Sequence, residues 1–446
     1  MLTTLRNAWK IADLRKKILF TLLIILLYRI GNVIPVPFVN VESMSQMFNE
    51  QLSGTILGLF NMMSGNAFST ATIFALSIQP YINASIIIQL LTIAIPALER
   101  LSKEGGEEGK KKITKITRIT TVALGLLMGF AYYVMLTNYN SAYNNLLLTK
   151  TGVLPAIVII LTFTAGSTLV MWLGEQITEH GIGNGISMIL FANIIARIPG
   201  GIILPIWNDL LWSKWYWALA LVIGMLAIIV FIVFVSQAER RIPVQYAKRV
   251  VGRKVYGGQN THLPIKVNMS GVMPIIFAGS ILSIPPTIQM FIPSAKLADS
   301  KFWTGFFKVF TSTHWAYGII YFILIIAFAY FYSSIQYNPI EMSQNIAKNG
   351  GMIPGIRTGR PTSDYIARII SRITLLGALL LSVVAIFPIV FSQLTTLILT
   401  KTTIYADGMN VSLGGTSIII LVGVALETVK QLESQMMMRH YKGFLD

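Results

Sequence analysis

The chain has 446 residues, of which 54% are hydrophobic and only 12% are charged. A soluble protein of this length needs more polar surface, so the composition is typical of a polytopic membrane protein. Cysteine is absent, which excludes disulfides, thiol nucleophiles and cysteine-ligated metals. The 35 lysines and arginines outnumber the 18 acidic residues, and in membrane proteins such an excess usually lies in cytoplasmic loops.

Ten apolar runs are long enough to cross a bilayer. In chain order they are roughly 18–35, 72–95, 118–137, 153–173, 185–205, 215–236, 268–291, 315–336, 371–395 and 411–430. The connections after the second, sixth and eighth runs are rich in Lys and Arg, whereas those on the alternate side hold few cations. The basic connections are therefore predicted to be cytoplasmic, and both termini fall on that side.

Residues 58–71 differ from the runs, because they are apolar but too short and too polar to span. Small and polar residues interrupt them at Ser64, Gly65, Asn66, Ser69 and Thr70. A segment of this kind at membrane depth is tolerated only inside protein or beside a water-filled cavity. The pattern alone favours a functional half-helix and an interfacial decoration equally.

Two predicted cytoplasmic loops are long. The loop 237–267 has Gly252, Gly257 and Gly258 in a cation-rich context and predicts a projecting hairpin. The loop 337–370 carries NGGMIPGIRTGRPT, in which Gly and Pro impose turns. Their length favours a docking platform, because topology alone needs only a few charges near the helix ends.

The runs contain almost no ionisable groups, apart from Arg29 near the end of the first. Ion-coupled transporters place carboxylates or cations at mid-membrane, and a membrane hydrolase needs an acid, base or metal centre. Both alternatives, including a transporter with a discontinuous helix at 58–96, are therefore disfavoured. The four histidines are scattered, so we predict no metal site, cofactor or catalytic residue.

The second run instead carries uncharged polar side chains, which in hydrocarbon need a partner or water. They are Gln79, Asn83, Ser85 and Gln89. Pro80 in this run and Pro274 in the seventh each remove a ladder hydrogen bond and are expected to bend them, although membrane helices also tolerate proline. The motif GIGNGIS at 181–187 lacks the Lys-Ser/Thr of a phosphate loop and predicts a turn that begins a helix.

Several long motifs, in the right order, resemble the SecY family, the channel subunit of the bacterial Sec protein translocon (SecYEG). They are YRIGNVIPVP at 28–37, LFNMMSGNA at 59–67, QPYINASIIIQLLT at 79–92, MWLGEQITEHGIGNGIS at 171–187, THLPIKVNMSGVMP at 261–274, GGMIPGIRTGRPT at 350–362 and GGTS at 414–417. The loops around 137–152 and 292–312 resemble nothing specific.

The resemblance implies an all-α fold of ten membrane helices around a central hourglass pore. The helices form two pseudo-symmetric halves, here 1–210 and 211–446, hinged between the fifth and sixth spans. A short plug half-helix is implied at about 55–69, and its glycines and serines are expected to supply little packing and so to leave it displaceable. The implied plug residues are Leu59, Phe60, Asn61, Met62, Met63, Ser64 and Gly65.

The resemblance also places an apolar pore ring and a lateral gate. The ring consists of Ile78, Ile82, Leu190, Ile276 and Ile420, with Leu190 at a position where isoleucine is commoner in the family. A ring without hydrogen-bonding groups holds no stable water and therefore blocks ions. The gate lies between the second and seventh spans at Pro80, Ser85, Gln89 and Pro274, where Ser85 and Gln89 are expected to hold it closed by hydrogen bonds.

The partners that the resemblance implies are SecE and SecG in the membrane. The SecA motor ATPase and the ribosome are expected to contact the basic loops at Arg253, Lys254 and Arg357. Polypeptides that carry a signal sequence cross the pore or leave through the gate into the lipid bilayer. The expected function is a passive, gated protein-conducting channel of the bacterial cytoplasmic membrane, and not an enzyme.

Overall fold

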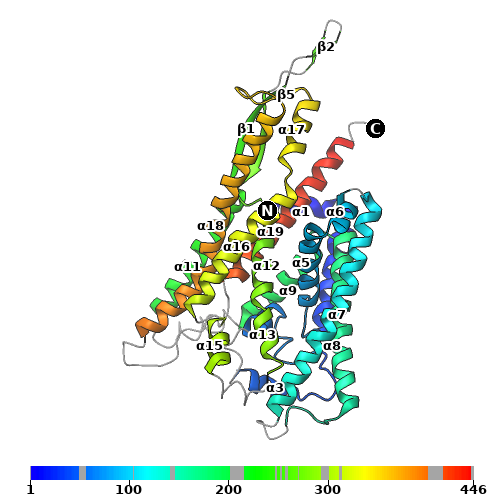
Figure 1. The fold of residues 1–446 in the computed structure, drawn as a ribbon, viewed down its shortest axis with the longest axis vertical. Coiled ribbons are helices and arrows are strands. Elements are labelled where there is room, and N and C mark those ends of the chain that lie inside the picture. The colour runs from blue at the N-terminus through cyan, green and yellow to red at the C-terminus, as the bar shows by residue number, and fades with distance from the viewer. Residues whose placement is uncertain are drawn as a thin grey trace.

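The computed structural model describes residues 2–49, 57–103, 105–140, 146–200, 215–246, 249–251, 254–256, 260–269, 271–292, 301–310, 314–399 and 415–442. The described chain is mainly helical and elongated, and its long helices run side by side (Figure 1). The helices are α1 (Leu2–Lys10), α2 (Ala12–Gly31), α3 (Val41–Met47), α4 (Leu57–Met63), α5 (Gln79–Ala94), α6 (Pro96–Lys103), α7 (Gly106–Asn140), α8 (Val153–His180), α9 (Gly185–Ile198), α11 (Trp215–Gln237), α12 (Met273–Leu282), α13 (Ile284–Gln289), α15 (Lys301–Val309), α16 (Trp315–Gln336), α17 (Pro339–Lys348), α18 (Arg360–Leu399) and α19 (Gly415–Lys442).

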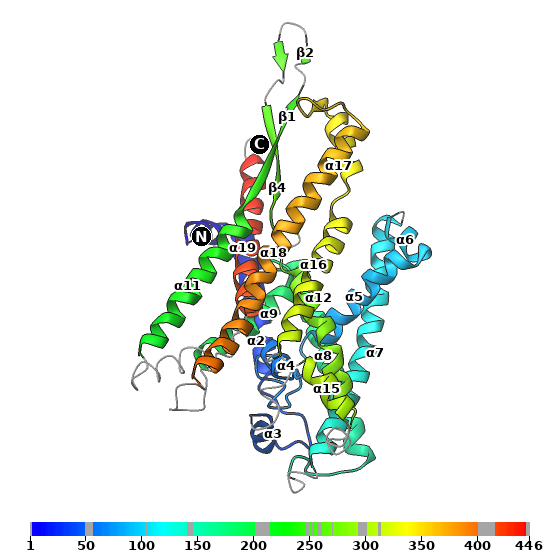
Figure 2. The same cartoon turned by 60° about the vertical axis from the view of Figure 1, so that its left-hand side comes forward.

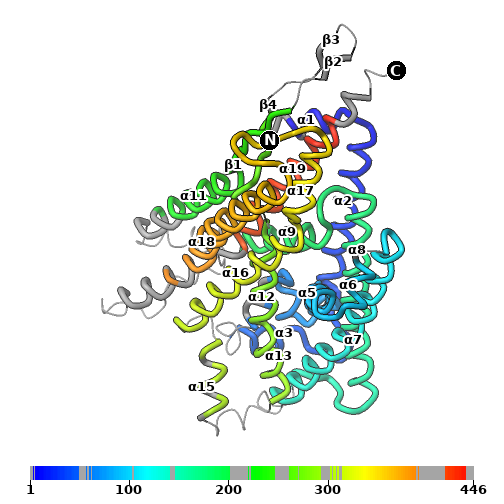
Figure 3. Tube along the Cα trace, turned by 45° about the horizontal axis from the view of Figure 1, so that its top comes forward, coloured from blue at the N-terminus to red at the C-terminus, as the bar shows by residue number. Residues whose placement is uncertain are grey.

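The helices pack in two groups. Helices α2, α5, α7, α8 and α9 contact one another, and so do α11, α12, α16, α18 and α19. Contacts of α5 with α12 and of α9 with α19 join the two groups (Figure 3). A large apolar core lies along this junction, and it draws side chains from α2, α5, α8 and α9 on one side and from α12, α16 and α19 on the other.

The outer faces of the helices are apolar. Leu26 of α2 is 62% exposed, Leu161 of α8 54% and Phe234 of α11 74%. Such a continuous apolar exterior is suited to lipid. Four described stretches are long and apolar enough to cross a membrane, and a pair bent by 105° makes a fifth. The four are Gly106–Asn140, Val153–His180, Trp315–Lys348 and Arg360–Phe387, and the bent pair is Gln79–Ala94 with Pro96–Ser102.

Each of the ten predicted runs contains a helix, but the second and seventh runs are not single helices over the predicted range. The second run is helical only from Gln79, because residues 72–78 form turns. The seventh divides at Ser283 into α12 and α13. Pro80 and Pro274 lie in the first turn of α5 and α12, where a fixed φ suits the helix and no N–H is needed. The expectation that these two prolines bend their helices is therefore wrong, since both begin a helix.

The loop 237–267 forms the predicted projecting hairpin. Its strands β1 (Glu239–Tyr246) and β4 (Asn260–Lys266) pair antiparallel from Glu239 opposite Lys266 to Gln245 opposite Asn260. Strand β5 (Gly351–Met352) adds to β1, and β2 (Arg249–Val251) pairs with β3 (Lys254–Tyr256) at the tip. The described chain is mostly helical, as predicted, but it is not all-α, because a small sheet forms here. Alternating burial along β1 places Ile242 and Val244 on a small core shared with α17 and α18.

The basic connections gather at one end of the molecule. Figure 2 shows the β1–β4 hairpin and α17 at this end, α6 at the corresponding end of the helix group that contains α5 and α7, and α3 and α15 toward the opposite end. This arrangement matches the alternation of basic and cation-poor connections along the sequence.

The turn predicted for GIGNGIS at 181–187 is confirmed, and it positions α9. Asn184 caps α9, because its Oδ1 accepts from the backbone N–H groups of Ile186 at 3.1 Å and Ser187 at 3.3 Å. Directly after the cap, Gly185 packs against the backbone of Gly174 in α8, where a Cβ would collide with the Gly174 carbonyl oxygen. This close approach fixes α9 at the centre of the bundle.

Candidate pore cavity and its closing segment

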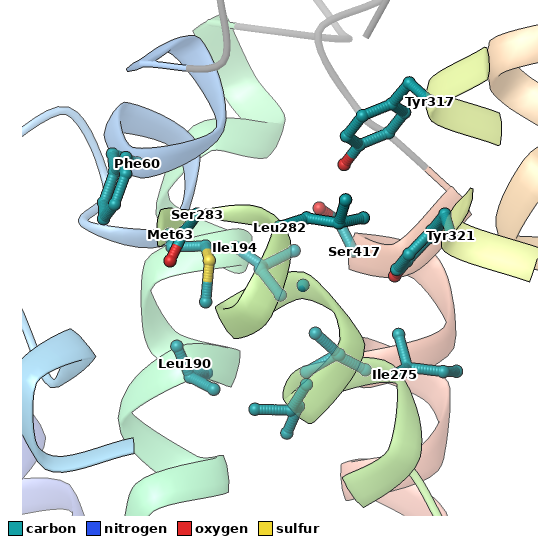
Figure 4. Close-up of a pocket in the computed structure, with 13 residues that line it drawn as sticks. Phe60, Met63, Leu190, Ile194, Ile275, Leu282, Ser283, Tyr317, Tyr321 and Ser417 are labelled. Atoms are coloured by element: carbon teal, nitrogen blue, oxygen red, sulfur yellow. The ribbon is translucent and has the colours of Figure 1, made fainter. Parts of the chain in front are cut away.

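A cavity of about 70 Å³ lies where the two helix groups meet. In Figure 4, Phe60 and Met63 of α4 and Leu190 of α9 lie on one side of it, and Tyr317 and Tyr321 of α16 lie on the other. Its full lining is Phe60, Met63, Leu190, Ile194, Ile275, Ile276, Gly279, Leu282, Ser283, Tyr317, Tyr321, Ser417 and Ile420. None of these lining residues is charged, and the polar ones offer only hydroxyl groups. Such a wall gives an ion or a small polar solute few ligands.

The five residues predicted as a pore ring are all buried. Ile78 is 1% exposed, Ile82 3%, Leu190 1%, Ile276 4% and Ile420 6%, and all five belong to the apolar core at the junction of the groups. Leu190, Ile276 and Ile420 also line the cavity. Ile78 and Ile82 pack into the core behind it. The structure thus brings the five side chains from α5, α9, α12 and α19 to one region, and their role as a seal stays a prediction.

The α4 segment, residues 57–78, comprises α4 and the turns that lead into α5. The turns fold tightly onto Asn61, a residue of α4. The Asn61 carbonyl oxygen accepts from Ser64 Oγ at 3.1 Å, and Asn61 Oδ1 accepts from the N–H of Ser69 at 2.9 Å. Ser64 Oγ in turn accepts from the N–H of Phe68 at 3.0 Å. Ser64 and Ser69 are buried, so the expectation that these serines supply little packing is wrong.

Aromatic contacts fix the turns of the α4 segment to the bundle. Phe68 packs edge-on against Tyr132 of α7 with ring centroids 4.8 Å apart, and Tyr132 Oη donates to the Phe68 carbonyl oxygen at 2.6 Å. Phe74 stacks on Tyr28 of α2 at 5.4 Å. These contacts hold residues 68–77 against the bundle, and Phe60 of α4 stacks on Phe68 with ring centroids 6.1 Å apart.

The junction between α4 and the turns has a left-handed backbone. Gly65 has φ +67° and Asn66 has φ +74°, a conformation that glycine adopts readily and asparagine tolerates. A Cβ on Gly65 would lie 2.9 Å from Asn193 Oδ1 and 3.1 Å from Arg29 Nη1. Glycine is therefore required here both for the backbone conformation and for the close approach of two polar side chains.

Those polar side chains belong to a buried cluster on α2 and α9. Asn193 Nδ2 donates to the Met63 carbonyl oxygen of α4 at 2.7 Å and to Tyr28 Oη at 2.8 Å. It also lies 3.4 Å from Ser77 Oγ, and Asn32 Nδ2 donates to Asn193 Oδ1 at 3.5 Å. The sequence analysis did not single out Asn193. The sequence feature that could have indicated its importance is a single amide in the otherwise apolar stretch MILFANIIA, because a polar side chain between membrane helices needs a partner.

The contact between α5 and α12 is bridged by Gln79. Its Nε2 donates to Ser283 Oγ at 3.2 Å and to Ser280 Oγ at 3.4 Å. Gln89 Nε2 instead donates to Ser85 Oγ at 3.4 Å within α5. The bond expected between the two spans therefore forms at Gln79, whereas the recorded bond of Ser85 and Gln89 stays within one helix. Pro80 and Pro274 begin the two facing helices.

The remaining predicted positions lie at the ends of the molecule or outside the described residues. Arg357 is exposed in the turn between β5 and α18, and its carbonyl oxygen accepts from Thr362 Oγ1 at 2.7 Å. Lys254 begins β3 at the tip of the hairpin. Arg253 and the plug positions 55 and 56 lie outside the described residues, and Leu59 and Met62 lie within α4. Among the residues that the structure describes, no three His, Asp or Glu side chains group as a metal site.

Comparisons with known proteins agree with this architecture. The family model SecY matches residues 72–429. The protein translocase subunit SecY of Mycobacterium bovis is 44% identical over 457 residues, covering 100% of both chains. A structure described as a protein conducting channel aligns with a TM-score of 0.63 and 17% identity over 94% of this chain and 91% of that one. Another, described as showing that the plug domain of SecY stabilises the closed state and maintains a membrane seal, aligns at 0.61 and 18% over the same shares.

The described apolar helices, four of them in stretches long enough to cross a bilayer, and the apolar cavity at the junction of the helix groups define a membrane protein with the fold of that structure. The chain belongs to the SecY family of protein translocase subunits, because the family model and a full-length relative both match it.

Proposed function

We propose that the cavity is the closed waist of a passive, gated pore through which unfolded polypeptides cross the bacterial cytoplasmic membrane. The observation that carries this proposal is the convergence of α4, α9, α12, α16 and α19 on one apolar cavity. Leu190, Ile276 and Ile420 of the five-residue ring close around it, Ile78 and Ile82 belong to the same apolar core, and the ring parts when a chain enters. Branched aliphatic side chains suit this role, because they exclude water without binding any particular sequence.

In this proposal ten helices span the membrane in two halves, 1–210 and 211–446. The packing of α2 to α9 and of α11 to α19 into separate groups supports the division. Helices α5 and α12 form the lateral gate, through which apolar segments reach lipid. The gathering of basic connections at one end supports a cytoplasmic position for that end and for both termini. The pore itself performs no chemical step.

Helix α4 acts as the plug. Phe60 and Met63 close one side of the cavity, and the left-handed junction at Gly65 and Asn66 gives α4 a hinge beside the fixed turns. Leaving the cavity requires α4 to expose Leu57 and Phe60, which are now 5% and 6% exposed. Burial of each such side chain favours the closed state by roughly 1.5–3 kcal/mol.

Replacing residues 57–63 by a Gly-Ser stretch of equal length is expected to raise the resting ion conductance of proteoliposomes about tenfold or more, because a loss of ~1.4 kcal/mol already shifts an equilibrium tenfold. The matched control replaces α15, which lies outside the cavity lining, in the same way. If the conductance of the α4 variant stays at the wild-type level, α4 does not close the pore.

The basic end docks the energy-supplying partners, namely SecA or the translating ribosome, while SecE and SecG are the membrane partners. Exposed Arg and Lys side chains suit acidic protein surfaces or the phosphate backbone of RNA. The proposed contacts are Arg357 in its exposed turn, Lys254 at the start of β3 and Arg253, which precedes Lys254 in the chain.

Arg357→Glu is expected to lower SecA-driven export of a signal-bearing polypeptide roughly tenfold, since charge reversal turns a favourable contact into a repulsive one. The amount of the protein in the membrane should not change, because Arg357 is exposed. Lys348→Glu, an equally exposed cation at the end of α17, is the control. Equal losses in both variants would mean that the net loop charge, and not Arg357, is recognised.

A further inference from the structure

We propose that Asn193 is a positioning residue that latches α4 over the cavity and couples its release to movement of α9. This inference rests on the proposed plug function of α4. It begins from a single bond: Asn193 Nδ2 donates to the Met63 carbonyl oxygen at the last residue of α4, and the distance is 2.7 Å. Carbonyl groups at the end of a helix have no partner within the helix, so this oxygen needs a donor from elsewhere.

The rest of the cluster orients the Asn193 amide. Its other short bond is to Tyr28 Oη at 2.8 Å, and Asn32 donates to its Oδ1. Tyr28 and Asn193 have no measurable exposure. Because α2 holds the amide in place, its donor stays aimed at α4. In the closed state the amide side chain therefore joins α2 and α9 to the short helix α4.

Arg29 is a second polar group at the junction between α4 and the turns. Its Nη1 is buried without a hydrogen-bond partner in the described part of the chain, and it lies beside Gly65 together with Asn193 Oδ1. A buried guanidinium N–H group without a partner favours a nearby acceptor. In the closed state the junction at Gly65 therefore packs against two polar groups, Asn193 Oδ1 and Arg29 Nη1, and not against aliphatic side chains alone.

The position of Asn193 on α9 supplies the coupling. Leu190 of the proposed ring precedes it by three residues and Ile194 of the cavity lining follows it directly. Residues three apart lie on one face of a helix, about 4.5 Å apart along the axis. A polypeptide that pushes Leu190 outward moves α9 as a rigid rod and draws the amide away from Met63. Opening of the ring then weakens the hold on the plug.

The test uses the absence of cysteine, which makes an introduced thiol unique. Ser64→Cys places a thiol at a buried site of the α4 segment that is 1% exposed, and its reaction with a membrane-impermeant maleimide reports release of α4. In this background Asn193→Leu, which keeps the volume but loses the donor, is expected to react roughly 3- to 30-fold faster, the loss expected for one or two buried hydrogen bonds. Asn193→Asp is expected to react faster too, since a carboxylate faces the Met63 oxygen without donating.

Two variants separate the latch from general damage to packing. Tyr28→Phe removes one bond that orients the Asn193 amide but keeps the donor to α4, so it is expected to raise the rate less than either Asn193 variant does. Thr121→Val removes a buried hydroxyl that bonds only within α7 and should leave the rate unchanged. Wild-type reaction rates in both Asn193 variants, or an equal rise in Tyr28→Phe, would overturn the latch. The α4 replacement described above tests the plug separately, because it is read as conductance: if it raises conductance while the Asn193 variants do not raise labelling, only the latch fails.

Discussion

Serine at Leu190, Ile276 and Ile420 is expected to make the closed channel leak ions. These three residues line the cavity from α9, α12 and α19 and are 1%, 4% and 6% exposed. An apolar constriction keeps ions out because water there has no hydrogen-bonding partners, and three hydroxyl groups would supply them. Ion flux through reconstituted proteoliposomes should rise at least tenfold, the change that ~1.4 kcal/mol produces.

The experiment has to separate the effect of added polarity from the effect of lost side-chain volume. Shortening a buried aliphatic side chain by itself lowers the free energy of unfolding by about 2–5 kcal/mol. The control therefore carries Leu190→Met, Ile276→Leu and Ile420→Leu, which conserve volume and stay apolar. We expect it to remain tight. A second variant with serine at Ile78 and Ile82, which pack behind the cavity, is expected to leak less than the first. Wild-type flux in the triple-serine variant would show that the seal lies elsewhere.

Gln79→Leu is expected to loosen the proposed lateral gate. Gln79 is 3% exposed, and its amide donates to Ser280 and Ser283 across the contact of α5 with α12. Hydrogen bonds between membrane helices contribute roughly 0.6–2 kcal/mol, so their loss should increase the open population about 3- to 30-fold. Spin labels on cysteines at Ile87 of α5 and at Ile288 of α13, the helix that follows α12, would report the longer distances of the open gate, because both side chains are exposed.

Gln89→Leu is the matched control for this prediction. Gln89 is a glutamine of the same helix, but the bond that it donates goes to Ser85 within α5. Its removal should leave the distance distribution unchanged. If the two variants behave alike, or if Gln89→Leu alone opens the contact, Gln79 does not hold the gate.

Sequence patterns predicted the parts of this fold that depend on local chemistry. The apolar runs located the long helices of the described residues, the basic connections indicated one end, and the glycines near 252–258 indicated the hairpin that β1 and β4 form. The Asn184 cap was likewise visible as a turn. Each of these signals arises from residues close together in the chain.

The parts that were missed depend on neighbours distant in sequence. Residues 72–78 look like the start of a span, yet Ala71 and Ser77 have φ of +46° and +49°. The stacking of Phe74 on Tyr28 holds this non-helical path, and no local pattern records it. Pro80 was interpreted as a bend because the true start of α5 was not known. Asn193 was missed because its bonding partner, the Met63 carbonyl oxygen, is 130 residues away in the sequence.

The central claim is that a polypeptide passes between the two helix groups at the apolar cavity. Photoreactive amino acids placed singly at Leu190, Ile276 and Ile420, and at lipid-facing Leu161 as a control, test it directly when a translocating chain is arrested in the membrane. The account predicts cross-links to the arrested chain from the three cavity positions and none from Leu161, which is 54% exposed on the outer face of α8. Cross-links from Leu161, together with no cross-links from the three cavity positions, would contradict it.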